Sequence, residues 1–93
     1  MKNEMKTEFL SIPENESFAR TVAAAFILPL DPTTEEMSEI KTAISEAVTN
    51  SVIHGYSKNI GIITLTGRMT ENTVIFTVSD SGCGIENINK ARE

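Results

Sequence analysis

The apolar positions along the chain change their period several times, and these changes divide it into expected strands and helices. Apolar residues alternate loosely over residues 5–12, which predicts a strand, and recur at helical spacing over residues 14–28 and again over residues 34–54. Two further alternating segments, residues 60–68 and 73–80, are typical of strands. The order strand, helix, long helix, strand, strand predicts an α+β fold with the helices on one face of a mixed β-sheet.

Local sequence signals indicate where the helices begin and end. Pro29 is expected to end the first helix, because the residue before a proline avoids the α region. Thr33 and Glu36 have the spacing of a capping box at the start of the long helix. Gly55 is expected to stop that helix, and we expect residues 86–93 to begin a further helix.

The long helix is expected to carry both core residues and site residues. At 100° per residue, its core-type side chains fall on one face, between roughly 100° and 200° from Glu46; they are Met37, Ile40, Ile44, Ala47, Val48 and Ser51. Glu46, Asn50 and His54, spaced four apart, form a polar stripe that points away from this face.

This polar stripe has chemical uses as well as a simpler interpretation. A glutamate can act as a general base, an asparagine offers a hard oxygen to Mg²⁺, and a histidine can donate to a phosphate. The spacing Glu46-x-x-x-Asn50 is nevertheless common by chance, so taken alone it favours a solvated helix face.

A second motif, Asp80-x-Gly82-x-Gly84, follows the expected strand 73–80. The carboxylate at a strand end can accept a hydrogen bond from an exocyclic amine, and the glycines let the backbone approach a ring closely. A tight turn that leaves a strand explains the same residues. Taken alone, this motif is also weak evidence for a ligand site.

Together, in this order and separation, the two motifs resemble those of the GHKL superfamily of ATPases, which contains gyrase, histidine kinases and the mismatch-repair ATPases. Glu46-x-x-x-Asn50 matches the N box and Asp80-x-Gly82-x-Gly84 the first glycine box. Within the superfamily, the chain is similar to the small anti-sigma serine kinases of spore-forming bacteria, over residues 1–5, 15–20, 40–42, 45–50 and 53–56. The resemblance is collinear, covers essentially the whole chain, and implies the Bergerat ATP-binding fold.

The resemblance implies a homodimer that binds a sporulation sigma factor and uses ATP with Mg²⁺ to phosphorylate a serine of an anti-anti-sigma protein. In that role Glu46 is the general base or the residue that orients the attacking hydroxyl. Asn50 holds Mg²⁺ and through it the phosphates, and His54 contacts a phosphate. Asp80 accepts from the adenine amino group of ATP or ADP. Gly82 and Gly84 shape the adenine pocket.

The resemblance also draws attention to Arg20 in the first expected helix. The helical period places this side chain on the exposed side, where it is on its own an ordinary solvated charge. In the family this helix lies near the dimer and partner surfaces. Arg20 therefore becomes a candidate contact for the sigma factor or the anti-anti-sigma protein.

The chain departs from the family in one respect. Family members continue past the first glycine box into a nucleotide lid, a second glycine-rich box and closing strands and helix, whereas this chain stops at Glu93. We therefore expect residues 1–93 to form a single partial domain that is catalytically impaired. The alternatives are a non-catalytic partner-binding fragment, a general-stress anti-sigma kinase, or another GHKL ATPase; the short segment before the N box argues against a histidine kinase.

Composition narrows the function classes further. The net charge of −5 argues against direct nucleic-acid binding, because no basic patch is present to displace counterions. The single cysteine, Cys83, excludes an internal disulfide and suits a reducing compartment. The apolar stretch 21–30 is too short to span a bilayer. We therefore expect a cytoplasmic protein without a membrane partner.

Overall fold

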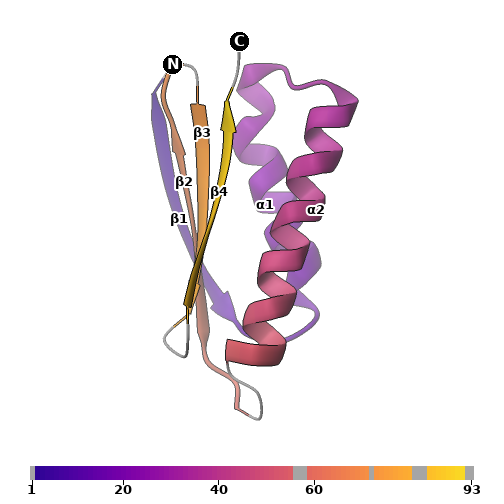
Figure 1. Ribbon diagram of the computed structural model, residues 1–93, viewed down its shortest axis with the longest axis vertical. Coiled ribbons are helices and arrows are strands. Elements are labelled where there is room, and N and C mark those ends of the chain that lie inside the picture. Colours follow the sequence, from indigo (N-terminus) through magenta and orange to yellow (C-terminus); the bar gives the residue numbers. More distant parts are fainter. Residues whose placement is uncertain (1, 56–58, 72, 81–83, 92–93) are drawn as a thin grey trace.

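Two helices cover one face of a four-stranded sheet in the computed structural model, which describes residues 2–55, 59–71, 73–80 and 84–91 (Figure 1). The elements are β1 (Asn3–Leu10), α1 (Asn15–Ile27), the 3₁₀ turn η1 (Leu28–Leu30), α2 (Thr34–Asn50), the π-helical turn η2 (Ser51–Gly55), β2 (Ile62–Met69), β3 (Thr73–Asp80) and β4 (Gly84–Ala91). This arrangement confirms the predicted α+β fold with helices on one face of the sheet.

The described strands follow one another across the sheet in chain order, β1-β2-β3-β4. Each strand pairs antiparallel with the next one. The expected mixed sheet would need a parallel pair, and the described strands contain none. Antiparallel neighbours need only short connections, which fits the few residues that separate β2 from β3.

The prediction that residues 86–93 begin a helix is wrong for the described part of that segment. β4 pairs with β3 along its full length, from Asp80 opposite Gly84 to Thr73 opposite Ala91. Without this strand, one edge of β3 would expose a row of unpaired backbone N–H and C=O groups. Asparagine is also a poor helix former, and Asn87 and Asn89 fall in the middle of the segment.

The core lies between the helices and the sheet, as the apolar pattern predicts. Alternate residues of β2 and β3 are buried there, and so is the predicted face of α2, with Met37 packed at its margin. The buried apolar residues are Phe9, Ala19, Ala23, Ile27, Ile40, Ile44, Ala47, Val48, Ile63, Leu65, Met69, Val74, Phe76 and Val78. Ser51, the polar member of the predicted face, is buried as well.

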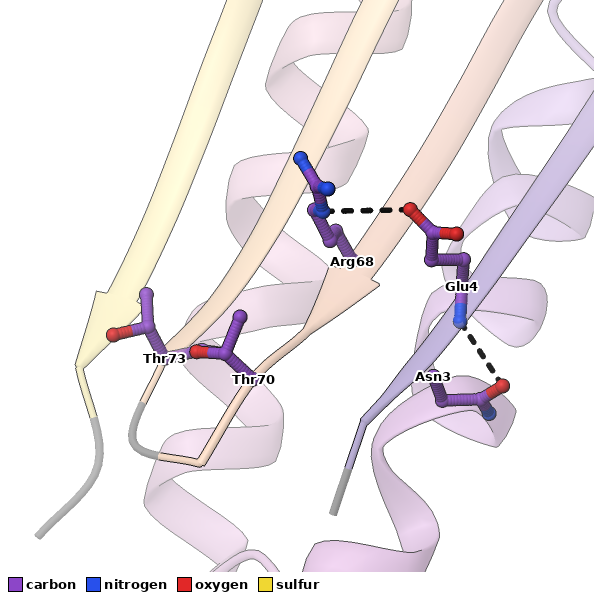
Figure 2. Close-up of polar contacts among 5 residues, drawn as sticks. All are labelled: Asn3, Glu4, Arg68, Thr70 and Thr73. Carbon is purple, nitrogen blue, oxygen red and sulfur yellow. Dashed lines mark hydrogen bonds and ion pairs between the residues drawn. The ribbon is translucent and has the colours of Figure 1, made fainter.

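Most of the described side chains on the opposite face of β1, β2 and β3 are polar, with Leu10, Ile62 and Ile75 as apolar exceptions. Figure 2 shows Glu4 of β1 and Arg68 of β2 pointing toward one another from neighbouring strands, with the Glu4 Oε1 and Arg68 Nε atoms 3.3 Å apart. Both side chains are about 70% exposed, so this ion pair contributes little to stability. Thr70 closes the β2–β3 hairpin, since its amide donates to the Thr73 carbonyl oxygen at 2.9 Å.

The start of α2 has the predicted capping box. Thr33 Oγ1 accepts from the Glu36 amide at 3.0 Å, and the Glu36 carboxylate accepts from the Thr33 amide at 2.9 Å. The helix then runs to Asn50 and widens into η2, so the chain remains helical through Gly55, as expected. The wider π turn moves His54 away from the angle that an uninterrupted α-helix would give it.

Because the capping box satisfies two amides at the start of the longest helix, Thr33→Ala is expected to lower the free energy of unfolding by about 1 kcal/mol. Urea denaturation monitored by circular dichroism measures this loss. Thr34→Ala is the matched control, because Thr34 is the first residue of the helix and has no capping role. Equal losses in the two variants would contradict the capping assignment.

Candidate functional site

The stripe predicted on the long helix lies on its final turns. Glu46 and Asn50 are exposed residues of α2, and His54 is exposed in η2. The exposure of Glu46 and Asn50 agrees with the helical wheel, which places them away from the core face. The structure thus presents the carboxylate and the amide one turn apart at the end of α2.

Asp80 comes from a distant segment but lies at the same end of the molecule. It is the last residue of β3 and is half-buried. Figure 1 shows that β3 and α2 end at the same end of the fold, and η2 packs against β3. The fold therefore places the end of the N box and the start of the first glycine box at the same end of the molecule.

The structure describes one of the two glycines of the second motif. Gly82 lies outside the described residues. Gly84 opens β4, and its backbone pairs opposite Asp80. The role of the two glycines in an adenine pocket stays a prediction.

A groove of about 690 Å³ runs between α1 and α2 on the side of Glu46 away from Asn50. Most of its lining side chains are small or carry hydroxyls, which leaves space between the two helices. The lining residues are Arg20, Pro32, Thr33, Thr34, Met37, Ser38, Lys41, Thr42, Ser45 and Glu46. Two cations and one carboxylate therefore face a volume within the range of protein ligand sites.

Arg20 is not on an exposed face, so that prediction is corrected. The side chain is half-buried in the groove, and its Nη1 atom donates to Ser45 Oγ on α2 at 2.9 Å. The wheel of α1 alone could not show this, because the flank that carries Arg20 is covered by a helix from another part of the chain.

Sequence reasoning also missed the residues of α2 that form the groove. The signal was present, because Ser38, Lys41, Thr42 and Ser45 have the spacing of one helix face and lie directly beside Glu46. That face is polar, and a polar face on a helix is ordinarily solvated. The groove becomes evident only in the structure, where α1 packs beside this polar face of α2 and contributes Arg20.

A Mg²⁺ ion that enters with a nucleotide would need few ligands from the protein. In the described part of the chain, no three His, Cys, Asp or Glu side chains gather closely enough to hold a metal ion. Asn50 would supply a single hard oxygen. Mg²⁺ in nucleotide sites is held in this way, by one or two protein oxygens together with phosphates and water.

The match to a family model defines the class of protein. Residues 9–93 match the family model described as a histidine kinase-like ATPase domain, and the chain belongs to this family. The resemblance to GHKL ATPases expected from the two motifs is thereby confirmed.

The similarity to anti-sigma proteins is confirmed as well. The chain is 56% identical over 91 residues to the anti-sigma F factor of Thermoanaerobacter sp. (strain X514). It is 50% identical over 91 residues to that of Clostridium kluyveri (strain ATCC 8527), and 51% identical over 94 residues to that of Bacillus cereus (strain G9842). These alignments cover 98–100% of this chain, which spans 64% of the length of each relative.

Among the described residues, no helix combines the length and apolar character needed to cross a membrane.

Proposed function

We propose that the whole protein is an anti-sigma factor and serine kinase. It binds a sporulation sigma factor, and it uses ATP to phosphorylate a serine of an anti-anti-sigma protein. The observation that carries this proposal is the position of Glu46, which lines the groove that holds Arg20 and lies one turn before Asn50. The membership in the histidine kinase-like ATPase family and the similarity to anti-sigma F factors support it.

In this proposal the nucleotide binds at the end of the molecule where α2 and β3 both end (Figure 1). Asp80 accepts a hydrogen bond from the adenine amino group, and Gly82 and Gly84 let the backbone lie close to the ring. Asn50 offers its amide oxygen to Mg²⁺, and His54 donates to a phosphate. When bound, Mg²⁺ neutralises the charge of the phosphates.

Glu46 is the residue proposed to act on the protein substrate. Its carboxylate would orient the attacking serine hydroxyl and accept the hydroxyl proton as the serine oxygen bonds to the γ-phosphorus of ATP, while the bond from that phosphorus to the bridging oxygen breaks and ADP leaves. Phosphoryl transfer depends mostly on positioning and charge neutralisation. Because Glu46 lies between the groove and Asn50, the serine can approach from the groove while the nucleotide lies on the other side.

The groove is proposed as the place where protein partners contact this chain. Arg20 and Lys41 give it two positive charges, and the hydroxyls of α2 offer further hydrogen bonds. This chemistry suits an acidic segment of a partner, because a guanidinium pairs with a carboxylate through two parallel hydrogen bonds. The sigma factor and the anti-anti-sigma protein would then compete for one surface of a cytoplasmic homodimer.

Asn50→Ala is expected to weaken Mg²⁺-dependent ADP binding by about tenfold to a hundredfold, because it removes the proposed protein ligand of the metal ion. Isothermal titration of ADP into this chain, with and without Mg²⁺, measures the effect. Asn50→Asp keeps a hard oxygen and serves as the matched variant. Equal affinity in wild type and Asn50→Ala would exclude the metal role, and no binding to wild type would remove the nucleotide site from this chain.

A second function is favoured by the groove itself. All of its lining residues lie between Arg20 and Glu46, within α1, α2 and their connection. Partner binding by this segment therefore does not depend on nucleotide chemistry at the other end of α2. Under this alternative the 93-residue chain binds the sigma factor and transfers no phosphate, which a binding assay combined with a phosphorylation assay distinguishes.

A further inference from the structure

One hydrogen bond crosses the groove between the two helices. Arg20 Nη1 on α1 donates to Ser45 Oγ on α2 at 2.9 Å. Ser45 directly precedes Glu46, and both residues line the groove together with Arg20. The bond therefore attaches the proposed partner-binding arginine to the helix that carries the proposed catalytic base.

The chemistry of arginine makes this contact selective. A guanidinium carries five N–H donors in a fixed planar fork. Ser45 is its hydrogen-bond partner among the described residues and takes one of these donors, so the remaining edge can receive a carboxylate. The half-burial of Arg20 against α2 limits the directions in which its side chain can point.

We propose that Ser45 is a positioning residue that holds the Arg20 guanidinium in the groove, with its remaining N–H donors available to an acidic side chain of the protein partner. This inference rests on the proposed function, since it assumes that Arg20 contacts a partner. A free arginine loses considerable rotamer freedom when a partner orders it. If Ser45 has already ordered the arginine, less conformational entropy is lost when the partner binds, and the partner therefore binds more tightly.

The first test measures the arginine without any partner. The chain has three arginines, so the guanidinium signals can be separated by NMR in the 93-residue protein. Ser45→Ala is expected to speed the rotation of the Arg20 guanidinium by about tenfold, because a hydrogen bond to a charged group is lost. Arg68, which pairs with Glu4 on the far side of the sheet, is the internal reference and should not change.

Matched variants show whether the effect comes from the hydroxyl. Ser45→Thr keeps the hydroxyl and should restore slow rotation. Ser38→Ala removes a hydroxyl from the same groove two helical turns earlier and should have no effect on Arg20. Ser45→Cys keeps the side-chain volume, so it serves as a second variant if Ser45→Ala disturbs the amide spectrum of α2. Unchanged rotation in Ser45→Ala and Ser45→Cys would overturn the proposal.

The second test uses purified sigma F from Thermoanaerobacter sp. as the probe. Ser45→Ala is expected to weaken its binding about fivefold in the wild-type background and not at all in the Arg20→Ala background. The same loss in both backgrounds, or no loss in either, would overturn the positioning role. Absence of binding to wild type would instead overturn the proposed function, and the rotation rates would still decide whether Ser45 holds Arg20.

Discussion

Glu46→Gln is expected to lower the rate of serine phosphorylation by about 10²–10⁴-fold, the contribution typical of a general base. The amide of glutamine has nearly the same shape but cannot accept the hydroxyl proton. Binding of ATP should be unchanged, because Glu46 lines the groove side of α2 and the proposed metal ligand is Asn50. A loss in the catalytic rate with constant nucleotide affinity is thus the signature of the proposed role.

The assay for this prediction needs a chain of the relatives' full length. A chimera that continues this chain into the part of the Thermoanaerobacter relative that it does not cover would provide one, since the two are 56% identical over the matched region. Phosphate transfer from labelled ATP to a purified anti-anti-sigma protein reports the rate.

Glu39→Gln is the matched control for Glu46→Gln, because Glu39 is exposed on the same face of α2 two turns earlier and does not line the groove. Equal effects of the two substitutions would show a general effect of charge on α2 and would remove Glu46 from the chemistry.

The sequence predicted most of the fold because its signals are local. The alternation in β2 and β3, the capping box at Thr33 and the apolar face of α2 each depend on residues within a few positions of one another, and each is confirmed. β4 was missed because its conformation is decided by pairing with β3, and a segment cannot show its partner strand. The same limit explains why a mixed sheet was expected, whereas every described pair of strands is antiparallel.

The candidate site was likewise predicted where its signals are local and missed where they depend on packing between distant segments. The helical period of α2 predicted the exposed Glu46 and Asn50, whereas the π turn that moves His54 has no counterpart in that period. The groove forms where Arg20 of α1 lies beside the polar face of α2. Neither segment alone indicates a site. Motif spacing predicted the residues of the site, and the packing of α1 against α2 shows which of them face the groove.

Gly67 of β2 lies in close contact with the helix layer. A Cβ atom on Gly67 would lie 2.9 Å from Phe26 Cε2 and 3.2 Å from Met5 Cε. Phe26 also packs edge-on against Phe76, with ring centroids 5.9 Å apart, and Phe76 lies opposite Gly67 in the neighbouring strand. The missing side chain of Gly67 is therefore what lets the Phe26 ring lie close to β2 and beside Phe76.

Gly67→Val is expected to lower the free energy of unfolding by about 3 kcal/mol, because a ring and its buried neighbour must both move to admit the side chain. This is a large part of the stability of a small domain. Urea denaturation measures the loss. Gly61→Val, at a half-buried glycine before β2, is the matched control and should cost less.

A second substitution tests whether Phe26 is the cause of the Gly67→Val effect. Phe26→Leu removes the ring atoms that lie nearest to Gly67, so in that background Gly67→Val should cost less than it does in the wild type, with a coupling of about 1 kcal/mol. If the losses of stability caused by Gly67→Val and Phe26→Leu are additive, the strain lies elsewhere in the sheet. A coupled pair would show that the contact between Gly67 of β2 and Phe26 of α1 limits how closely that helix approaches the sheet.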